Sequence, residues 1–134
     1  MKTILTILFF IPFLVLAQNV ETRISYFKNG QVKERLAYVN GKLNGTSIIY
    51  FESGNIKETQ YYKDGLKDGE WVMFDDKKNK LTSAHFHNNK KDGEWTVWDS
   101  NGIVRFEMCY TEDKKSGYWI MRDETGYITQ IKNY

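Results

Sequence analysis

The sequence predicts an all-β protein, an elongated single antiparallel meander sheet of stacked 24-residue β-hairpin repeats. Three observations predict this fold. Rows cut at the repeat length, which start at Tyr26, Tyr50, Phe74, Trp98 and Arg122, keep their register to the end of the chain. All 10 glycines fall into three columns of these rows. Asn-Gly and Asp-Gly pairs, which are the strongest short-range signal for a hairpin turn, recur in the same phase.

The first 17 residues differ from the rest of the chain. Met1 and Lys2 give a short positive start, the run from Ile4 to Leu16 is almost wholly apolar, and the small residue Ala17 follows. This order is typical of a secretory signal that is cleaved at a small residue. We therefore expect residues 1–17 to be a signal peptide and residues 18–134 to be one repeat domain of about four and a half units.

A membrane anchor is the competing interpretation of this segment. The apolar run is shorter than the roughly 20 residues that a spanning helix needs, and Pro12 interrupts it. No cysteine lies near Ala17 to carry a lipid. We therefore expect a secreted or periplasmic protein with a cleaved signal and no lipid-anchoring cysteine.

Each of these rows is expected to form one β-hairpin. Runs such as 55–62 and 70–74 are rich in β-branched and aromatic residues and are bounded by turn residues, which is typical of strands. No segment after Ala17 carries apolar residues at helical spacing for three turns. A hairpin this small cannot bury its own apolar side, so neighbouring repeats must stack. The pattern predicts roughly nine strands in one twisted sheet.

The third row departs from the pattern. Lys78 stands where the other rows have glycine, Lys80 replaces a Val/Ile column, and Leu81 sits one place late. We expect a bulge or a longer turn near Lys77 to Lys80.

The segments 61–71 (YYKDGLKDGEW) and 88–95 (NNKKDGEW) resemble the bacterial variant of the MORN repeat, in a MORN_2-like protein of the YwqK-like family. The first unit departs from this pattern, since it has Gly45-Thr46-Ser47 in place of Gly-x-Trp. The resemblance implies a curved sheet of stacked hairpins used as an interaction scaffold. It also implies protein contacts, dimerisation or phospholipid binding. The antitoxin role of some bacterial members is not carried over, because a signal peptide would remove this chain from the cytoplasm.

Aromatic residues recur in three columns of the repeat. The columns are Trp71, Trp95 and Trp119; Tyr38, Tyr62, Phe86, Tyr110 and Tyr134; and Tyr26, Tyr50, Phe74 and Trp98. One interpretation is a structural ladder, in which each column interleaves with side chains of the neighbouring strand. The other is that an uncovered sheet face leaves aromatic surface for a protein or a sugar ring. On the second interpretation the binding residues are Trp71, Trp95, Trp119, Tyr62 and Tyr110.

Groups that could carry chemistry are few. His85 and His87 share one face of a strand, but no third metal ligand has a suitable spacing. Cys109, the only cysteine, has no catalytic motif around it and is expected to be a small buried thiol. We expect no catalytic residue, no metal site and no cofactor. A hydrolase centred on Cys109 and His85 is the distant alternative.

Charge argues against nucleic acid as a partner. The formal net charge is +2, and loss of Lys2 with the signal would leave +1, far from the excess that phosphate backbones select. The sequence therefore predicts an exported, non-catalytic scaffold for protein–protein interaction, with another protein or a second copy as the partner. The alternative is binding of a cell-envelope glycan or lipid through exposed aromatic columns.

Overall fold

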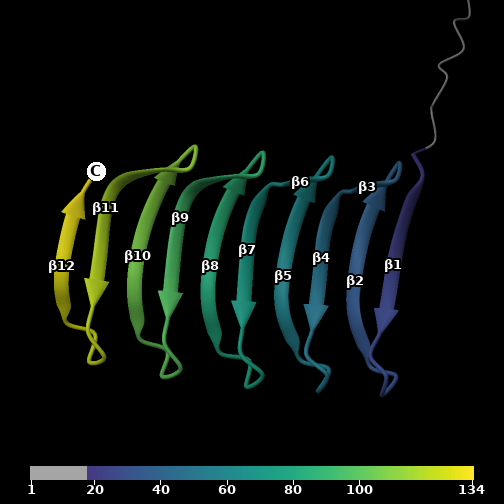
Figure 1. Cartoon of the computed structure of the whole chain (residues 1–134), viewed down its shortest axis with the longest axis horizontal. Helices are drawn as coiled ribbons and strands as arrows, with labels where there is room; N and C mark the ends of the chain where they lie inside the picture. The colour runs from purple at the N-terminus through teal and green to yellow at the C-terminus, as the bar shows by residue number, and fades with distance from the viewer. Residues whose placement is uncertain (1–17) are drawn as a thin grey trace, which may run out of the picture.

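A computed structural model of the chain describes residues 18–134 and shows one open antiparallel sheet (Figure 1). The described residues contain no helix. The predicted fold class, a meander of stacked hairpins, is confirmed. The signal peptide expected at residues 1–17 lies outside the described residues.

Ten long strands follow one another across the sheet in chain order, apart from two short segments that pair with their neighbours. The sequence led us to expect roughly nine, and the extra strand is Val20–Tyr26, which precedes the first full row. The short segments β3 and β6 lead into β4 and β7. The strands are β1 (Val20–Tyr26), β2 (Val32–Val39), β3 (Lys42–Leu43), β4 (Gly45–Tyr50), β5 (Ile56–Lys63), β6 (Leu66–Lys67), β7 (Gly69–Phe74), β8 (Lys80–His87), β9 (Lys90–Trp98), β10 (Val104–Thr111), β11 (Lys114–Arg122) and β12 (Ile128–Asn133).

Two-residue turns join the strands along the upper edge in Figure 1. Both residues of each turn have positive φ, as in Asn40-Gly41 at 50° and 76° and Asn88-Asn89 at 49° and 69°. Positive φ at both positions is the type I′ geometry, whose twist matches that of the flanking strands. Asn tolerates this conformation, which explains why Asn88-Asn89 turns as the Asn-Gly pair does.

Five-residue turns join the strands along the lower edge, and all five have the same bonds. In the third turn, Asp75 N donates to Asn79 O at 2.9 Å and Lys78 N donates to Asp75 O at 3.0 Å. Lys78 has φ of 71°, so it takes the conformation that glycine has in the other turns. Of the bulge or longer turn expected near Lys77 to Lys80, the structure has the bulge and not the longer turn. A bulge does oppose Phe74, but all five hairpins have one at this place.

The interior is thin because nothing described covers either face of the sheet. Val72, Ala84, Ser47 and Gln60 are the only buried residues of the described part. A single sheet with two open faces stabilises itself by contacts along the sheet, between neighbouring strands and between neighbouring turns. The packing that positions any functional surface therefore runs from repeat to repeat.

Candidate functional site

Seven aromatic rings form one continuous ladder across the C-terminal two-thirds of the sheet. Neighbouring ring centroids lie 5.2–5.4 Å apart with interplanar angles of 56–62° at the start of the ladder and 60–63° further along. This is the edge-to-face range in which aromatic pairs attract. The rings are, in order, Tyr62, Trp71, Phe86, Trp95, Tyr110, Trp119 and Tyr134. The five binding residues named from the sequence all lie in this ladder.

The register of the strands explains why two columns merge into one ladder. Trp71 of β7 and Trp95 of β9 both pair with Ala84 of the intervening strand β8. Ala84 is 5% exposed, and its small side chain leaves room for an indole on each side. Phe86, two residues further along β8, then stands between the two indoles. The third column differs, since its members make no ring–ring contact with any residue in 18–134.

Each indole of the ladder also has a bonded N–H. Trp95 Nε1 donates to His85 O at 3.1 Å, and Trp119 Nε1 donates to Cys109 O at 3.0 Å. Trp71 does the same with Tyr61 O at 3.2 Å. A half-buried indole N–H needs a partner, and here the backbone of the preceding strand supplies it. The indoles are thus fixed in orientation as well as packed.

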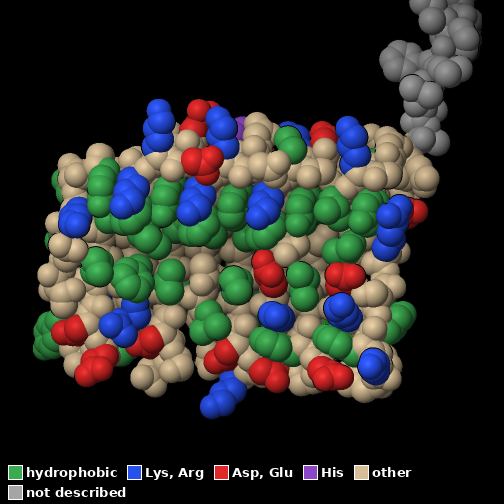
Figure 2. Space-filling model, in the orientation of Figure 1, with side chains coloured by type: hydrophobic (Ala, Val, Ile, Leu, Met, Phe, Trp, Pro, Cys, Tyr) green, Lys and Arg blue, Asp and Glu red, His purple; other side chains and the backbone are tan. Residues whose placement is uncertain are grey.

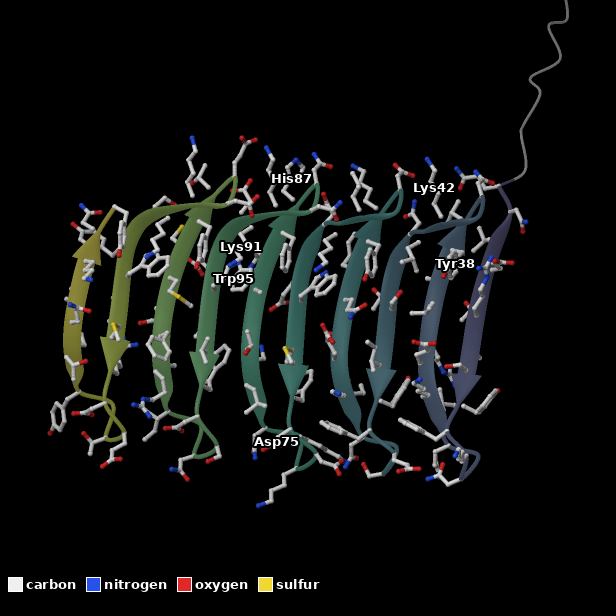
Figure 3. The ribbon with its side chains drawn as sticks, in the orientation of Figure 1. Tyr38, Lys42, Asp75, His87, Lys91 and Trp95 are labelled. Carbon is white, nitrogen blue, oxygen red and sulfur yellow. The ribbon has the colours of Figure 1, made fainter. Side chains whose placement is uncertain are left out.

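One lysine per repeat lies over the ladder. Lys91 Nζ is 4.6 Å from the Trp95 ring centroid and 4.8 Å from that of Tyr110 (Figure 3). Lys67 and Lys115 make the same pair of contacts at 4.3 to 5.1 Å in their own repeats. Figure 2 shows the result as a hydrophobic band with basic groups along it. These are cation–π distances, so each of these ammonium groups is attracted to the rings below it.

Two of these lysines, Lys67 and Lys91, are positioned by the turn of the following repeat. Lys67 N donates to Asn89 Oδ1 at 2.7 Å, and Asn89 N donates to Lys67 O at 2.9 Å. Asn89 thus satisfies both backbone groups of Lys67, which places the lysine at the start of its strand and over the rings.

The two histidines named from the sequence engage different partners. His85 Nδ1 is 3.2 Å from Glu94 O, and His87 Nδ1 is 3.0 Å from Asp68 Oδ2. Within residues 18–134, no three His, Cys, Asp or Glu side chains form a group that could hold a metal ion. Cys109 is half-exposed rather than buried as expected, because a single sheet has no second layer to cover it.

Four ionisable groups have shifted pKa values, each with a local cause. One is Arg23, whose pKa is raised by its hydrogen bond to Glu21. Burial raises the pKa of Tyr62 in the ladder, with Glu58 and Tyr38 adding to the effect. Its hydroxyl is 3.1 Å from Gln60 Oε1 and donates to it. At the opposite edge, hydrogen bonds from Asn79 lower the pKa of Asp75 and those from Thr125 lower the pKa of Asp123. These two carboxylates hold their turns together and face solvent.

Exposure separates the ladder from another surface that the sequence did not indicate. The five ladder residues proposed as binding residues are half-buried. Six exposed large hydrophobic side chains lie instead in β11, β12, the turn between them and the last residue of the chain, and three more lie in β1 at the opposite edge. We call the first six residues the C-terminal patch. They are Tyr118 (64%), Met121 (38%), Tyr127 (76%), Ile128 (53%), Ile131 (55%) and Tyr134 (49%).

The C-terminal patch includes an open sheet edge. All six residues of β12 are exposed, and within residues 18–134 β12 is paired only with β11. A hollow of about 290 Å³ opens on the ladder face beside it, lined among others by Phe106, Trp119 and Tyr134. The sequence did mark Ile128 and Tyr134 as members of repeat columns. What it did not show is that at the sheet edge the next repeat no longer covers them.

Comparison with known families adds one finding. A model of the MORN repeat variant matches residues 22–40, 43–64 and 91–112. These segments correspond to the hairpins β1–β2, β4–β5 and β9–β10, and the hairpins β7–β8 and β11–β12 share their geometry. No curated protein matches the chain. MORN repeats are in general motifs that bind proteins or membrane lipids. None of the described residues belongs to a helix long and apolar enough to cross a membrane.

Proposed function

We propose that the chain is an exported, non-catalytic repeat scaffold that binds a protein, either another chain or a second copy, through its C-terminal patch. The repeats supply a rigid frame, since ring, lysine and turn contacts pass from each hairpin to the next. Export rests on the signal-like residues 1–17. The bacterial, YwqK-like origin that the resemblance implies remains a prediction.

The observation that carries this proposal is that exposed apolar side chains lie on both faces of one open edge, with Tyr118 and Ile131 on one face and Met121 on the other. Six of the 13 exposed large hydrophobic residues in the described part belong to the C-terminal patch. Clustered apolar surface beside unpaired strand edges is typical of a protein contact site. A partner strand added to β12 would pair its free backbone groups, and the side chains around it would supply specificity.

The ladder itself fits a structural role better than a direct contact role. Ring edges point at the faces of neighbouring rings, and lysine ammonium groups lie over them. A sugar ring stacks on an open aromatic face, and this packing leaves few faces open. We therefore treat Trp71, Trp95, Trp119, Tyr62 and Tyr110 as the frame that holds the patch. Glycan or lipid binding through these columns becomes an outcome of the test.

A non-catalytic role is supported by the separate local contacts of the reactive residues. His85 and His87 each contact a fixed oxygen, and the backbone of Cys109 receives an indole N–H. The Gly117 backbone packs against the Cys109 side chain, where an added Cβ would lie 3.7 Å from Cys109 Cβ. If the chain were a hydrolase, the wild type would show hydrolase activity and Cys109→Ser would lack it.

The test is capture of partners from cell-envelope extract with the tagged mature chain and two matched variants. Ile128→Lys changes the patch, whereas Ile56→Lys changes the same repeat position in the middle of the sheet; these isoleucines are 53% and 39% exposed. We expect a discrete protein, identified by mass spectrometry, that binds the wild type and Ile56→Lys and is lost with Ile128→Lys. Equal capture by all three would overturn the assignment of the patch. Retention of cell-wall fragments or anionic vesicles without protein would favour the glycan or lipid alternative.

A further inference from the structure

We infer that the partner at the C-terminal patch is a second copy of this chain, joined head to tail. In this arrangement β1 of the second copy pairs antiparallel with β12 of the first and continues the sheet. The inference rests on the proposed function and deepens it, because it names the occupant of the same surface. Three observations support it: the register that the repeat sets between the two edges, the exposed isoleucines that meet in this register, and the opposite charges in the neighbouring turns.

Both outer strands of the sheet are open. In the described part β1 is paired only with β2 and β12 only with β11, and the two outer strands run in opposite directions (Figure 1). A second copy laid in the same orientation beyond β12 therefore presents its β1 in the antiparallel sense. Unpaired N–H and C=O groups on both edges favour such strand addition.

The phase of the repeat places the two edges in register. β1 is built like β4, since Val20–Tyr26 fills the same repeat positions as 44–50. Each junction between hairpins has the same cross-strand pair, moved along the chain by one repeat each time. The pairs are Arg35 with Ile48, Thr59 with Val72, Ser83 with Thr96 and Glu107 with Ile120. The next member of this series joins Ile131 to Ile24 of the second copy.

The residues that meet in this register are apolar and exposed. Ile131 is 55% exposed and Ile24 is 40% exposed in the single chain. Directly opposed β-branched residues stabilise an antiparallel pair. On the other face, Arg23 occupies the tryptophan column and already lies 4.0 Å from the Tyr38 ring centroid. In the second copy it would stand beside Tyr134, where Trp71 stands beside Tyr62.

Charge complements the contact along the lower edge. Neighbouring turns of this edge touch within the chain, as Asn29 Nδ2 donates to Glu52 O at 3.2 Å and Ser53 bonds Asp76. Continued by one repeat, this contact joins Thr125 to Lys28 of the second copy, and the turn of Thr125 also carries the acidic residues Asp123 and Glu124. Opposite charges in neighbouring turns attract each other and favour this orientation of the two copies.

One pair of like charges opposes association and limits its affinity. The same register sets Lys132 opposite Arg23 of the second copy, and like charges directly opposed destabilise a sheet. Glu21, whose carboxylate lies 2.5 Å from Arg23, offsets part of this repulsion. A lysine on an edge strand is also a common means of limiting edge-to-edge aggregation. We therefore expect reversible association, which Lys132→Glu should strengthen.

Sedimentation equilibrium of the purified mature chain, from about 1 µM to about 1 mM, tests the inference. We expect the wild type to form oligomers with rising concentration, and Ile56→Lys, which alters an exposed isoleucine in the middle of the sheet, to behave in the same way. Ile24→Lys and Ile131→Lys should each weaken association at least about tenfold. Circular dichroism and thermal unfolding check that these surface variants remain folded.

Mixing the two edge variants separates head-to-tail pairing from its alternatives. Ile24→Lys keeps an unaltered β12 edge, and Ile131→Lys keeps an unaltered β1 edge. An equimolar mixture should therefore form dimers and no larger oligomers. Dimers of Ile24→Lys alone would show pairing of β12 with β12, and dimers of Ile131→Lys alone would show pairing of β1 with β1; either would overturn the inference.

A wild type that stays monomeric over the whole range would also overturn it. If that monomer still captures an envelope protein through Ile128, the proposed function stands and only this inference fails. Oligomers that are unaffected by Ile131→Lys, together with protein capture that is unaffected by Ile128→Lys, would refute the role of the patch in both.

Discussion

Asp113 forms hydrogen bonds with both backbone groups of Lys91, the N–H and the C=O. Asp113 N donates to Lys91 O at 2.9 Å, and Lys91 N donates to Asp113 Oδ1 at 2.8 Å. The turn between β10 and β11 thus fixes Lys91, whose ammonium group lies over the Trp95 and Tyr110 rings. This contact links the turn edge to the aromatic ladder and explains how a sheet without a second layer keeps a defined shape.

Asp113→Gly should destabilise the chain by about 1 kcal/mol, because the Lys91 N–H loses its acceptor while the turn keeps its positive φ. Asp113→Asn should lie within a few tenths of a kcal/mol of the wild type, since Asn89 performs the same role one repeat earlier. Urea unfolding of the two variants measures the difference. Equal stability of Asp113→Gly and the wild type would show that the hydrogen bonds between Asp113 and Lys91 contribute nothing to the free energy of unfolding.

Trp95→Ala should cost about 3 kcal/mol, at the lower end of the range for buried aromatic residues, because Trp95 is half-buried but contacts rings on both sides. Trp95→Phe keeps ring contacts and loses the bond to His85 O, so it should cost about 1 kcal/mol. Denaturant unfolding followed by far-UV circular dichroism gives both values. A loss well below 1 kcal/mol for Trp95→Ala would instead identify Trp95 as a contact residue.

Lys91→Met should cost about 0.5–1 kcal/mol, because it keeps an apolar stem over the rings and removes the charge that they attract. Lys90→Met is the matched control, since Lys90 Nζ lies 3.4 Å from Glu112 Oε2 and makes no cation–π contact with the ladder rings. The control should change stability by a few tenths of a kcal/mol at most. Similar losses in the two variants would argue against a cation–π contribution.

The carboxyl groups of Asp75 and Asp123 should titrate in the folded chain below the ordinary value of 3.8, because hydrogen bonds favour their charged form. A lowered pKa gives stability that is present above pH 3.8 and is lost as the pH falls through the lowered value. Carbon-detected NMR titration measures both groups. Asn79→Ala should raise the Asp75 midpoint and leave that of Asp123 unchanged; a rise in neither would refute the assigned cause.

Turn chemistry explains why the fold could be predicted from the sequence. The recurring Asn-Gly and Asp-Gly pairs adopt local conformations that hardly depend on distant contacts, as the positive φ of Asn40 and Asp64 shows. The interleaving of aromatic side chains on neighbouring strands was also expected. It follows from the two-residue alternation of a strand once the register is known.

Other features depend on contacts that a repeat pattern does not contain. Lys78 adopts a glycine-like φ because Asp75 holds its turn with bonds to Lys77 N and Asn79 N at 2.9 and 2.8 Å. The position of Lys91 over the rings depends on Asp113, which belongs to the following repeat. The exposure of Ile131 depends on where the sheet stops. The binding roles first assigned to Trp71, Trp95, Trp119, Tyr62 and Tyr110 remain predictions.

The most direct test of the central claim, that the C-terminal patch is the binding surface, is amide hydrogen exchange of the mature chain with and without its captured partner. An edge strand exchanges rapidly at its unpaired amides, so a partner strand should slow exchange in β12. Strands in the middle of the sheet, such as β5, should be unchanged. Protection that appears along the ladder strands and spares β12 would contradict the account and return the binding role to the aromatic columns.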